Sequence, residues 1–148
     1  MFETILFGVL SIFLVKLSYE DWKTKLIDVP TTLFASGFVC AAYLFSFRFW
    51  EVFFWGIFFL IASKILKPYC EEKKFIGSGD ISILSVLLPA AWFVNQYLLA
   101  VFLVLFGIIA LIAYRKDLLE LKQERPLVPV ITVAWVLTWV FWVVLLKA

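Results

Sequence analysis

Residues 97–114 read YLLAVFLVLFGIIALIAY, an apolar run without a single charged side chain. A run of this length can cross the hydrocarbon core of a bilayer as one helix. The rest of the chain has the same character, because 65% of its 148 residues are hydrophobic and only 16% are charged. A soluble domain of this size has no way to bury so much apolar surface. The sequence therefore predicts an all-α, polytopic membrane protein with one domain, residues 1–148.

Further apolar runs lie on both sides of this one, and we expect six membrane-spanning helices that form a bundle. They cover about Thr4–Tyr19, Thr32–Phe47, Phe49–Leu66, Ile81–Val94, Tyr97–Tyr114 and Leu127–Leu146. The fourth run is short, but residues 81–114 are too long for one span, and the polar pair Asn95-Gln96 is the natural break. Before the second run, the hydroxyls of Thr31 and Thr32 are predicted to cap the helix.

The basic residues are distributed unevenly between alternate loops. The first, third and fifth loops hold Lys16, Lys23 and Lys25; Lys64, Lys67, Lys73 and Lys74; and Arg115, Lys116, Lys122 and Arg125. Only Arg48 and Lys147 fall on the other side. Loops rich in Lys and Arg stay in the cytoplasm. We therefore expect these three loops inside, both termini outside, and a multi-pass protein of the cell membrane.

Between the third and fourth apolar runs stands Ile-Gly-Ser-Gly-Asp, residues 76–80. Gly77 and Gly79 permit backbone conformations and a close backbone approach that a Cβ atom would prevent, and Ser78 adds little bulk. Asp80 directly precedes an apolar helix, where aspartate is also a favoured N-cap. The stretch is compatible with a simple cap or with a carboxylate that does chemistry, and one residue can serve as both.

Asp21 lies just past the first apolar run, so it falls on the same predicted cytoplasmic side as Asp80. The chain has no histidine, which excludes Ser/His and Cys/His nucleophiles and most zinc sites. Cys40 and Cys70 have no recognised spacing and are interpreted as free thiols. Two adjacent carboxyls share one proton, so one can activate water while the other polarises a carbonyl, without a metal or cofactor. The pattern predicts aspartyl-protease chemistry carried by Asp21 and Asp80.

The helix ends suggest a division of roles within this pair. Asp80 would lie at a helix N-terminus, where the positive end of the dipole favours the ionised form. Asp21 would lie beyond a helix C-terminus, where the negative end disfavours it. Our hypothesis is that Asp80 is the base and Asp21 the protonated acid, within a pair that titrates as a unit.

Three stretches resemble one known family. Residues 77–80, Gly-Ser-Gly-Asp, match the GxGD motif of membrane-embedded aspartyl proteases. Residues 18–27, SYEDWKTKLI, resemble the first motif of the type IV prepilin and archaeal preflagellin peptidases, in which an aspartate after helix one precedes basic residues and Ile-Pro-Asn. Residues 126–129, PLVP, are similar to the Pro-x-x-Pro segment of that family.

The resemblance implies an aspartic endopeptidase that removes the short basic leader from type IV prepilin-like or preflagellin (archaellin) precursors at the cytoplasmic membrane face. Asp21 and Asp80 match the two catalytic aspartates, and Gly77 and Gly79 match the motif glycines. The expected partner is a precursor whose hydrophobic helix lies in the bilayer beside the bundle. No nucleic acid, metal or cofactor is expected, and the oligomeric state stays open.

The chain departs from the family pattern in three ways. Pro30 stands two positions later than the proline of Ile-Pro-Asn, and Ser82 replaces a common lysine. No N-terminal domain with paired Cys-x-x-Cys motifs precedes the first helix, so we expect a short form without methyltransferase activity.

Acidic residues near the predicted site have two interpretations. They could attract a basic leader, or they could simply balance nearby lysines. The candidates for substrate binding are Glu20, Asp28, Glu71 and Glu72.

Two alternative functions stay open at this point. A transporter subunit or assembly factor would carry no catalysis, and a transporter would need ionisable groups inside its spans. The spans hold none away from their ends, which counts against transport. A presenilin-like protease would keep the GxGD chemistry but cleave transmembrane helices, and it would carry a different first motif.

Overall fold

The computed structural model describes residues 2–24, 29–73, 78–115 and 127–146, and within these it leaves undescribed the side chains of residues 67, 69–73, 78, 79 and 146. The elements are α1 (Phe2–Thr24), α2 (Val29–Phe45), α3 (Phe49–Lys73), α4 (Ser78–Val94), α5 (Gln96–Tyr114), α7 (Val128–Phe141) and the π-helical turn η1 (Trp142–Leu146). The described residues include no strand, which confirms the predicted all-α class.

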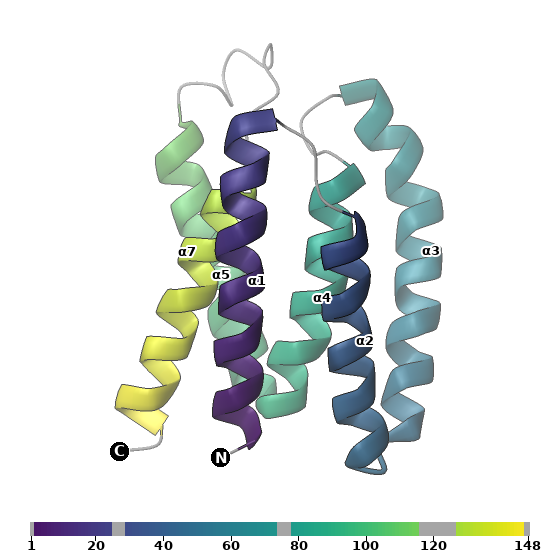
Figure 1. Ribbon diagram of the computed structural model, residues 1–148. Coiled ribbons are helices and arrows are strands. Elements are labelled where there is room, and N and C mark those ends of the chain that lie inside the picture. The colour runs from purple at the N-terminus through teal and green to yellow at the C-terminus, as the bar shows by residue number, and fades with distance from the viewer. Residues whose placement is uncertain (1, 25–28, 74–77, 116–126, 147–148) are drawn as a thin grey trace.

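The helices run up and down in alternation (Figure 1). We call the end of the bundle where α1 ends and α4 begins the upper end, as it is drawn in Figure 1. Helices α1, α3 and α5 end at the upper end and α2, α4 and α7 begin there, whereas α1 begins and α7 ends toward the lower end, where the two ends of the chain are marked (Figure 1). The two termini thus share one end of the bundle, as the predicted alternation requires.

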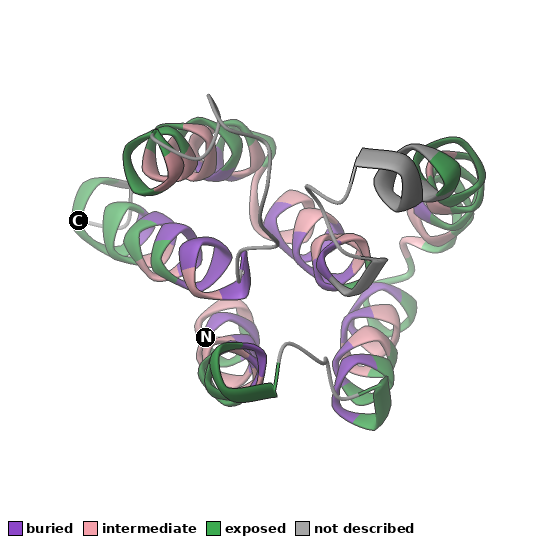
Figure 2. Cartoon of the chain, turned by 90° about the horizontal axis from the view of Figure 1, so that it is seen from above, coloured by how far each residue is buried: buried purple, intermediate pink, exposed green. Residues whose placement is uncertain are grey.

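Seen from above, α4 occupies the middle of the bundle (Figure 2). It packs against α1, α2, α3 and α5, while α7 packs against α1 and α5. The buried faces point inward (Figure 2). Aromatic rings from α1, α5 and α7 contact one another in the core. The indole of Trp135 is fully buried and stacks on Phe7 at 4.5 Å, with the edge of Phe102 at 5.7 Å.

The outer surface of the bundle is apolar along its length. Exposed large side chains on α1, α3 and α5 include Ile12, Phe53, Ile61, Val104 and Ile112. Within the described ranges, four stretches are long and apolar enough to cross a membrane: Phe2–Thr24, Phe49–Leu66, Gln96–Tyr114 and Val128–Leu145. The helix Val29–Phe45 and the segment Asp80–Val94 are also apolar but shorter. A surface of this kind belongs in lipid, because soluble proteins rarely expose continuous apolar area. The chain therefore has the character of a membrane protein.

Several helices extend beyond their predicted spans, because a helix does not have to stop where its apolar run stops. The span Phe49–Leu66 is as predicted, but helix α3 continues past it to Lys73, with Pro68 inside the helix. Helix α2 begins at Val29, so Thr31 and Thr32 lie inside its first turn rather than capping it. The Thr31 hydroxyl instead accepts a hydrogen bond from Lys16 Nζ at 2.9 Å.

The predicted break at Asn95 is confirmed. Asn95 has an extended backbone, and its side-chain oxygen accepts a hydrogen bond from the Tyr97 backbone N–H at 2.9 Å. Such a cap satisfies one of the free donors at the start of α5. Asn95 is thus the only residue between the end of α4 and the start of α5.

The corner between α2 and α3 is closed by a left-handed residue. Phe47 has φ = 57°, and the backbone N–H groups of Phe47 and Arg48 donate to Leu44 O and Tyr43 O at 3.1 and 3.0 Å. This pattern is a Schellman motif, in which glycine is the usual left-handed residue. A bulky phenylalanine in that conformation is strained by about 1–2 kcal/mol.

We expect Phe47→Gly to raise the free energy of unfolding by about 0.5–1 kcal/mol, since the strain removed exceeds the added flexibility of the unfolded chain. Phe45→Gly is the matched control. The two residues are almost equally exposed, Phe45 at 83% and Phe47 at 82%, but Phe45 has a helical backbone. It should lower stability by about 1 kcal/mol. Thermal unfolding in one detergent compares the two variants, and an equal loss in both would contradict the strain argument.

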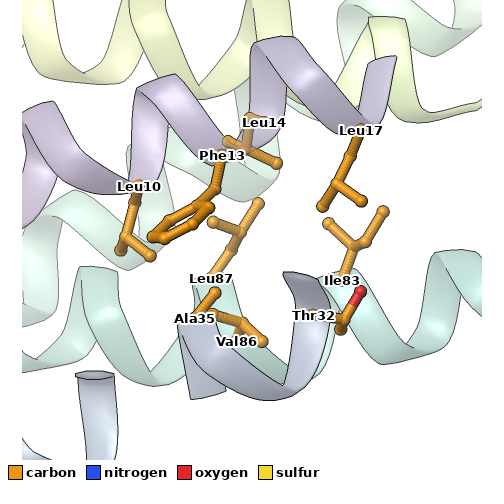
Figure 3. A pocket seen from close by; sticks show the side chains of 9 residues that line it. All are labelled: Leu10, Phe13, Leu14, Leu17, Thr32, Ala35, Ile83, Val86 and Leu87. Atoms are coloured by element: carbon orange, nitrogen blue, oxygen red, sulfur yellow. The ribbon is translucent and has the colours of Figure 1, made fainter. Parts of the chain in front are cut away.

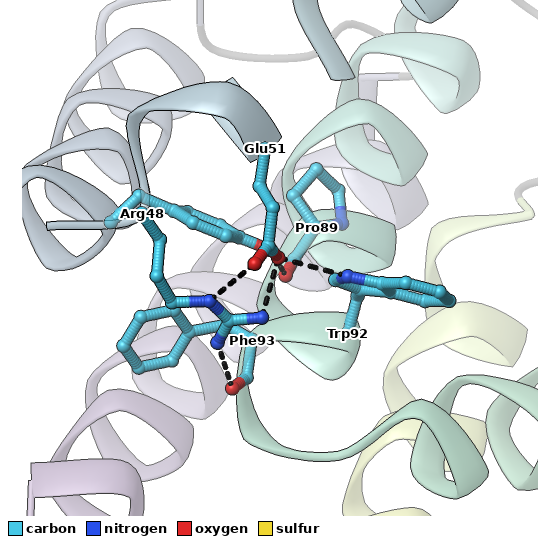
Figure 4. A network of polar contacts seen from close by, with 6 residues as sticks. Arg48, Glu51, Pro89, Trp92 and Phe93 are labelled. Carbon is cyan, nitrogen blue, oxygen red and sulfur yellow. Dashed lines mark hydrogen bonds and ion pairs between the residues drawn. The ribbon is translucent and has the colours of Figure 1, made fainter. Parts of the chain in front are cut away.

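A polar network fastens this corner to the lower end of α4 (Figure 4). Arg48 Nε donates to Glu51 Oε1 at 2.6 Å, and Arg48 Nη1 donates to the carbonyl of Phe93 at 2.8 Å. Trp92 Nε1 donates to Glu51 Oε2 at 2.9 Å. The Phe93 carbonyl belongs to the last turn of α4, where backbone acceptors lack partners within the helix. Arg48 therefore caps α4 and holds it in place at the end opposite Asp80.

Candidate active site

Both candidate aspartates lie at the upper end of the bundle. Asp21 is in the last turn of α1 and Asp80 in the first turn of α4, and each side chain is buried with only 7% of the residue exposed. Asp21 was predicted to follow its helix and Asp80 to precede its own, but α1 extends to Thr24 and α4 starts at Ser78. An aspartate is rarely buried to this extent unless its charge is paired or the residue belongs to a functional site.

A small apolar cavity shows how α1 and α4 face each other below the aspartates. Its lining includes Leu17 from α1 and Ile83 from α4, which lie across it from one another (Figure 3). Leu17 precedes Asp21 by four residues, and Ile83 follows Asp80 by three. Residues at these spacings share one face of a helix. Asp21 and Asp80 therefore each lie one helical turn above the apolar layer formed by Leu17 and Ile83. We infer that both aspartates lie on the faces that α1 and α4 turn toward each other.

A polar seam joins Asp21 to α7. The backbone N–H of Val128, the first residue of α7, donates to Asp21 Oδ2 at 3.4 Å. One turn lower, the hydroxyls of Ser18 and Thr132 are hydrogen-bonded at 3.0 Å. Pro129 carries no N–H, so it adds no unpaired donor to this helix start. The seam fixes the carboxylate of Asp21 against the N-terminus of α7.

This contact weakens the basis for the predicted division of roles. Asp21 was expected to experience only the negative end of α1, but the positive end of α7 also reaches it. Asp80, in the first turn of α4, lies at a positive helix end as predicted. The dipoles still favour Asp80 as the ionised base, but by less than predicted, because the end of α7 offsets the end of α1 at Asp21.

The motif residues around Asp80 differ in part from expectation. Ser78 and Gly79 are the first two residues of α4, and no described glycine has a positive φ. Gly79 therefore has an ordinary helical backbone, and the close backbone approach that its missing Cβ atom would permit stays a prediction. Gly77 lies outside the described residues.

The predicted substrate-binding acids are not brought together where the structure describes them. Glu20 pairs with Lys16, with Nζ and Oε1 3.7 Å apart, as expected if it balances a nearby lysine. Glu71 and Glu72 lie in the last turn of α3, with side chains that are not described. Asp28 lies outside the described residues. The described part of the chain holds no group of three or more His, Cys, Asp or Glu side chains placed to bind a metal ion.

Sequence reasoning missed Ser18, Thr132 and the N–H of Val128. A signal was present, because Ser18 and Asp21 share one face of α1, and Val128 and Thr132 share one face of α7. The partnership of α1 with α7 could not be read from either segment alone.

No family model, curated protein or solved structure matches this chain.

Proposed function

We propose that the protein is a membrane-embedded aspartic endopeptidase with Asp21 and Asp80 as its catalytic pair. The observation that carries this proposal is the placement of two buried carboxyls above one apolar layer shared by α1 and α4. Few other functions need two buried carboxyl groups at one end of a membrane helix bundle. The chain has no histidine, which a Ser/His or Cys/His hydrolase would need.

The proposed reaction uses the two carboxyls in opposite protonation states. The ionised carboxylate takes a proton from water, and the resulting hydroxide attacks the carbon of the scissile carbonyl. The protonated carboxyl gives its proton to the carbonyl oxygen as the tetrahedral intermediate forms. Collapse of the intermediate breaks the C–N bond, and the amine leaves with a proton from the first carboxyl. One hydroxyl of the intermediate returns its proton to the second carboxylate as the carbonyl forms again, which restores the starting protonation states. Helix N-termini beside both carboxyls stabilise the negative charge that appears in each step.

The substrate and the side of the membrane follow from the sequence. Residues 18–27 and 77–80 resemble the prepilin and preflagellin peptidase motifs, which favours a precursor with a short basic leader and a hydrophobic helix. Lys- and Arg-rich stretches of the sequence follow the ends of α1, α3 and α5, which lie at the upper end of the bundle, so we assign this end to the cytoplasm of a cell membrane. In this arrangement the aspartates lie where a leader on the cytoplasmic side would meet the membrane, with six helices spanning it and both termini outside.

Leader removal by the reconstituted protein tests the proposal. The purified chain in liposomes is incubated with a panel of prepilin, pseudopilin and archaellin precursors, and the products are measured by mass spectrometry. We expect a single cut at the junction of leader and hydrophobic helix, after a glycine in the preferred precursor. A precursor with that glycine replaced is the control and should be cut slowly. Failure to cut every precursor would contradict the proposed function.

A further inference from the structure

A series of hydrogen bonds leads from Ser18 to Asp21 through the start of α7. The hydroxyls of Ser18 and Thr132 are 3.0 Å apart. The Thr132 hydroxyl also donates to Val128 O at 2.9 Å and lies 3.4 Å from Leu14 O. Since its single proton goes to a carbonyl, Ser18 is the donor in the bond between the two hydroxyls. Val128 in turn donates its N–H to Asp21 Oδ2 at 3.4 Å. The two hydroxyls therefore hold the residue that contacts Asp21.

Asp21 acts as a cap for α7 from another helix. Leu127 is the N-cap residue of α7, and its side chain makes no capping hydrogen bond. The first N–H groups of a helix have no partner within it, and the N–H of Val128 is one of them. Val128 is fully buried, so solvent does not reach this donor. The contact with Asp21 therefore serves the start of α7 and the candidate active site together.

The strength of this cap changes during the proposed reaction. The dipoles favour Asp21 as the acid of the pair, which is neutral at first and ionised once the substrate carbonyl has its proton. A neutral carboxyl at 3.4 Å binds the N–H of Val128 weakly, whereas N–H bonds to carboxylates are shorter and stronger. The N–H thus favours the state that Asp21 reaches only as the tetrahedral intermediate forms, and this difference lowers the barrier.

We propose that Ser18 and Thr132 are positioning residues that keep the N–H of Val128 beside Asp21 throughout the reaction, an inference that depends on the proposed function. Serine and threonine hydroxyls do not titrate as carboxyls do, so the bond between them persists while Asp21 is neutral. The pair lies one turn below the contact of Asp21 with Val128, on the same faces of α1 and α7. Thr132 is buried, so it acts on the reaction only through Val128.

Removing the Thr132 hydroxyl while keeping the shape of the side chain tests the inference. We expect Thr132→Val to lower kcat for the precursor about tenfold, because a donor that shifts away from Asp21 stabilises the intermediate less. KM should stay unchanged, since the contact strengthens only after the substrate is bound. Thr132→Ser keeps the hydroxyl and should retain most of the wild-type kcat.

Thr138→Val is the matched control on the same helix. Thr138 is fully buried, and its hydroxyl donates to Ala134 O within α7 at 2.7 Å. The same substitution there removes a hydroxyl from α7 without removing a bond to Ser18, so cleavage should proceed at the wild-type rate.

A double variant tests whether the two hydroxyls act together. Ser18→Ala should lower kcat in the same way as Thr132→Val. The combination should be no slower than Thr132→Val alone, because both changes remove the same bond. Losses that multiply would show that Ser18 and Thr132 act separately, and they would overturn the inference.

Hydrogen exchange of the Val128 amide gives a readout that does not require catalysis. The protein is labelled with ¹⁵N-valine in detergent micelles, and exchange is followed by NMR. We expect the Val128 amide to exchange at least about tenfold faster in Thr132→Val than in the wild type, because its contact with Asp21 opens more often. Thr138→Val should exchange at the wild-type rate. Unchanged exchange in Thr132→Val would reject the positioning role.

The kinetic results separate this inference from the proposed function. Wild-type kcat in Thr132→Val, or equal losses in Thr132→Val and Thr132→Ser, would overturn the inference and leave the proposed function intact. A higher KM with unchanged kcat would assign the hydroxyls to substrate binding and would likewise overturn it. Failure of the wild type to cleave any precursor would remove the proposed function and the inference together.

Discussion

Leader cleavage is lost when either Asp21 or Asp80 is replaced by asparagine. Asparagine keeps the size of the side chain but can neither take a proton from water nor donate the proton that polarises the carbonyl. We expect each single variant to lower kcat/KM by roughly 10³-fold or more. The double variant should be no slower than either single variant, because the two carboxyls act as one unit. Rates are measured in liposomes at equal amounts of folded protein.

Glu3→Gln is the control, since Glu3 lies in the first turn of α1, at the end of the bundle away from the site. It removes one carboxylate from the same helix and should cleave at the wild-type rate. Cleavage that survives in Asp21→Asn or in Asp80→Asn would remove that aspartate from the mechanism. Losses that multiply in the double variant would show two groups acting independently.

Trp135→Ala should have the largest effect on stability. The side chain is fully buried in α7, stacked on Phe7 and packed against Phe102. Its truncation leaves a cavity where α1, α5 and α7 meet, and we expect a loss of about 3–5 kcal/mol in the free energy of unfolding. Unfolding in mixed micelles of increasing SDS content gives the measurement.

Trp135→Phe separates the ring from its N–H group. The indole nitrogen is buried and has no hydrogen-bond partner among the described residues. The phenyl ring keeps the aromatic packing and removes that unpaired donor, so we expect a loss of no more than about 1 kcal/mol. A loss as large as that of Trp135→Ala would mean that the nitrogen makes an important interaction, and the packing argument would fail.

The sequence predicted those parts of the fold that depend on local composition. Apolar runs located the six α-helices that the structure describes, and the amide of Asn95 located the break between α4 and α5, because a capping side chain acts within two residues. Alternation of helix direction then put both termini at one end of the bundle, and Asp21 and Asp80 at the other. These features follow from side chains that are close together along the chain.

Features that depend on distant segments could not be predicted in the same way. The contact of Val128 with Asp21 joins α7 to α1, and neither segment indicates the other. It changed the electrostatic surroundings of Asp21 and reduced the difference in helix-end charge on which the predicted roles of the pair depend. The left-handed Phe47 was missed because its residue type normally avoids that conformation, and the Schellman hydrogen bonds impose it.

We propose that Asp21 of α1 and Asp80 of α4 face each other. Crosslinking between pairs of introduced cysteines tests this most directly. In a background without native cysteines, Asp21→Cys is combined with Asp80→Cys, and a short thiol crosslinker is added in membranes. Leu17→Cys with Ile83→Cys, one turn lower around the shared cavity, is the positive control. Asp21→Cys with Val94→Cys, at the opposite end of α4, is the negative control. We predict efficient crosslinking of the aspartate pair and of the positive control alone. Crosslinking of the Leu17 and Ile83 positions without crosslinking of the Asp21 and Asp80 positions would contradict the catalytic pair.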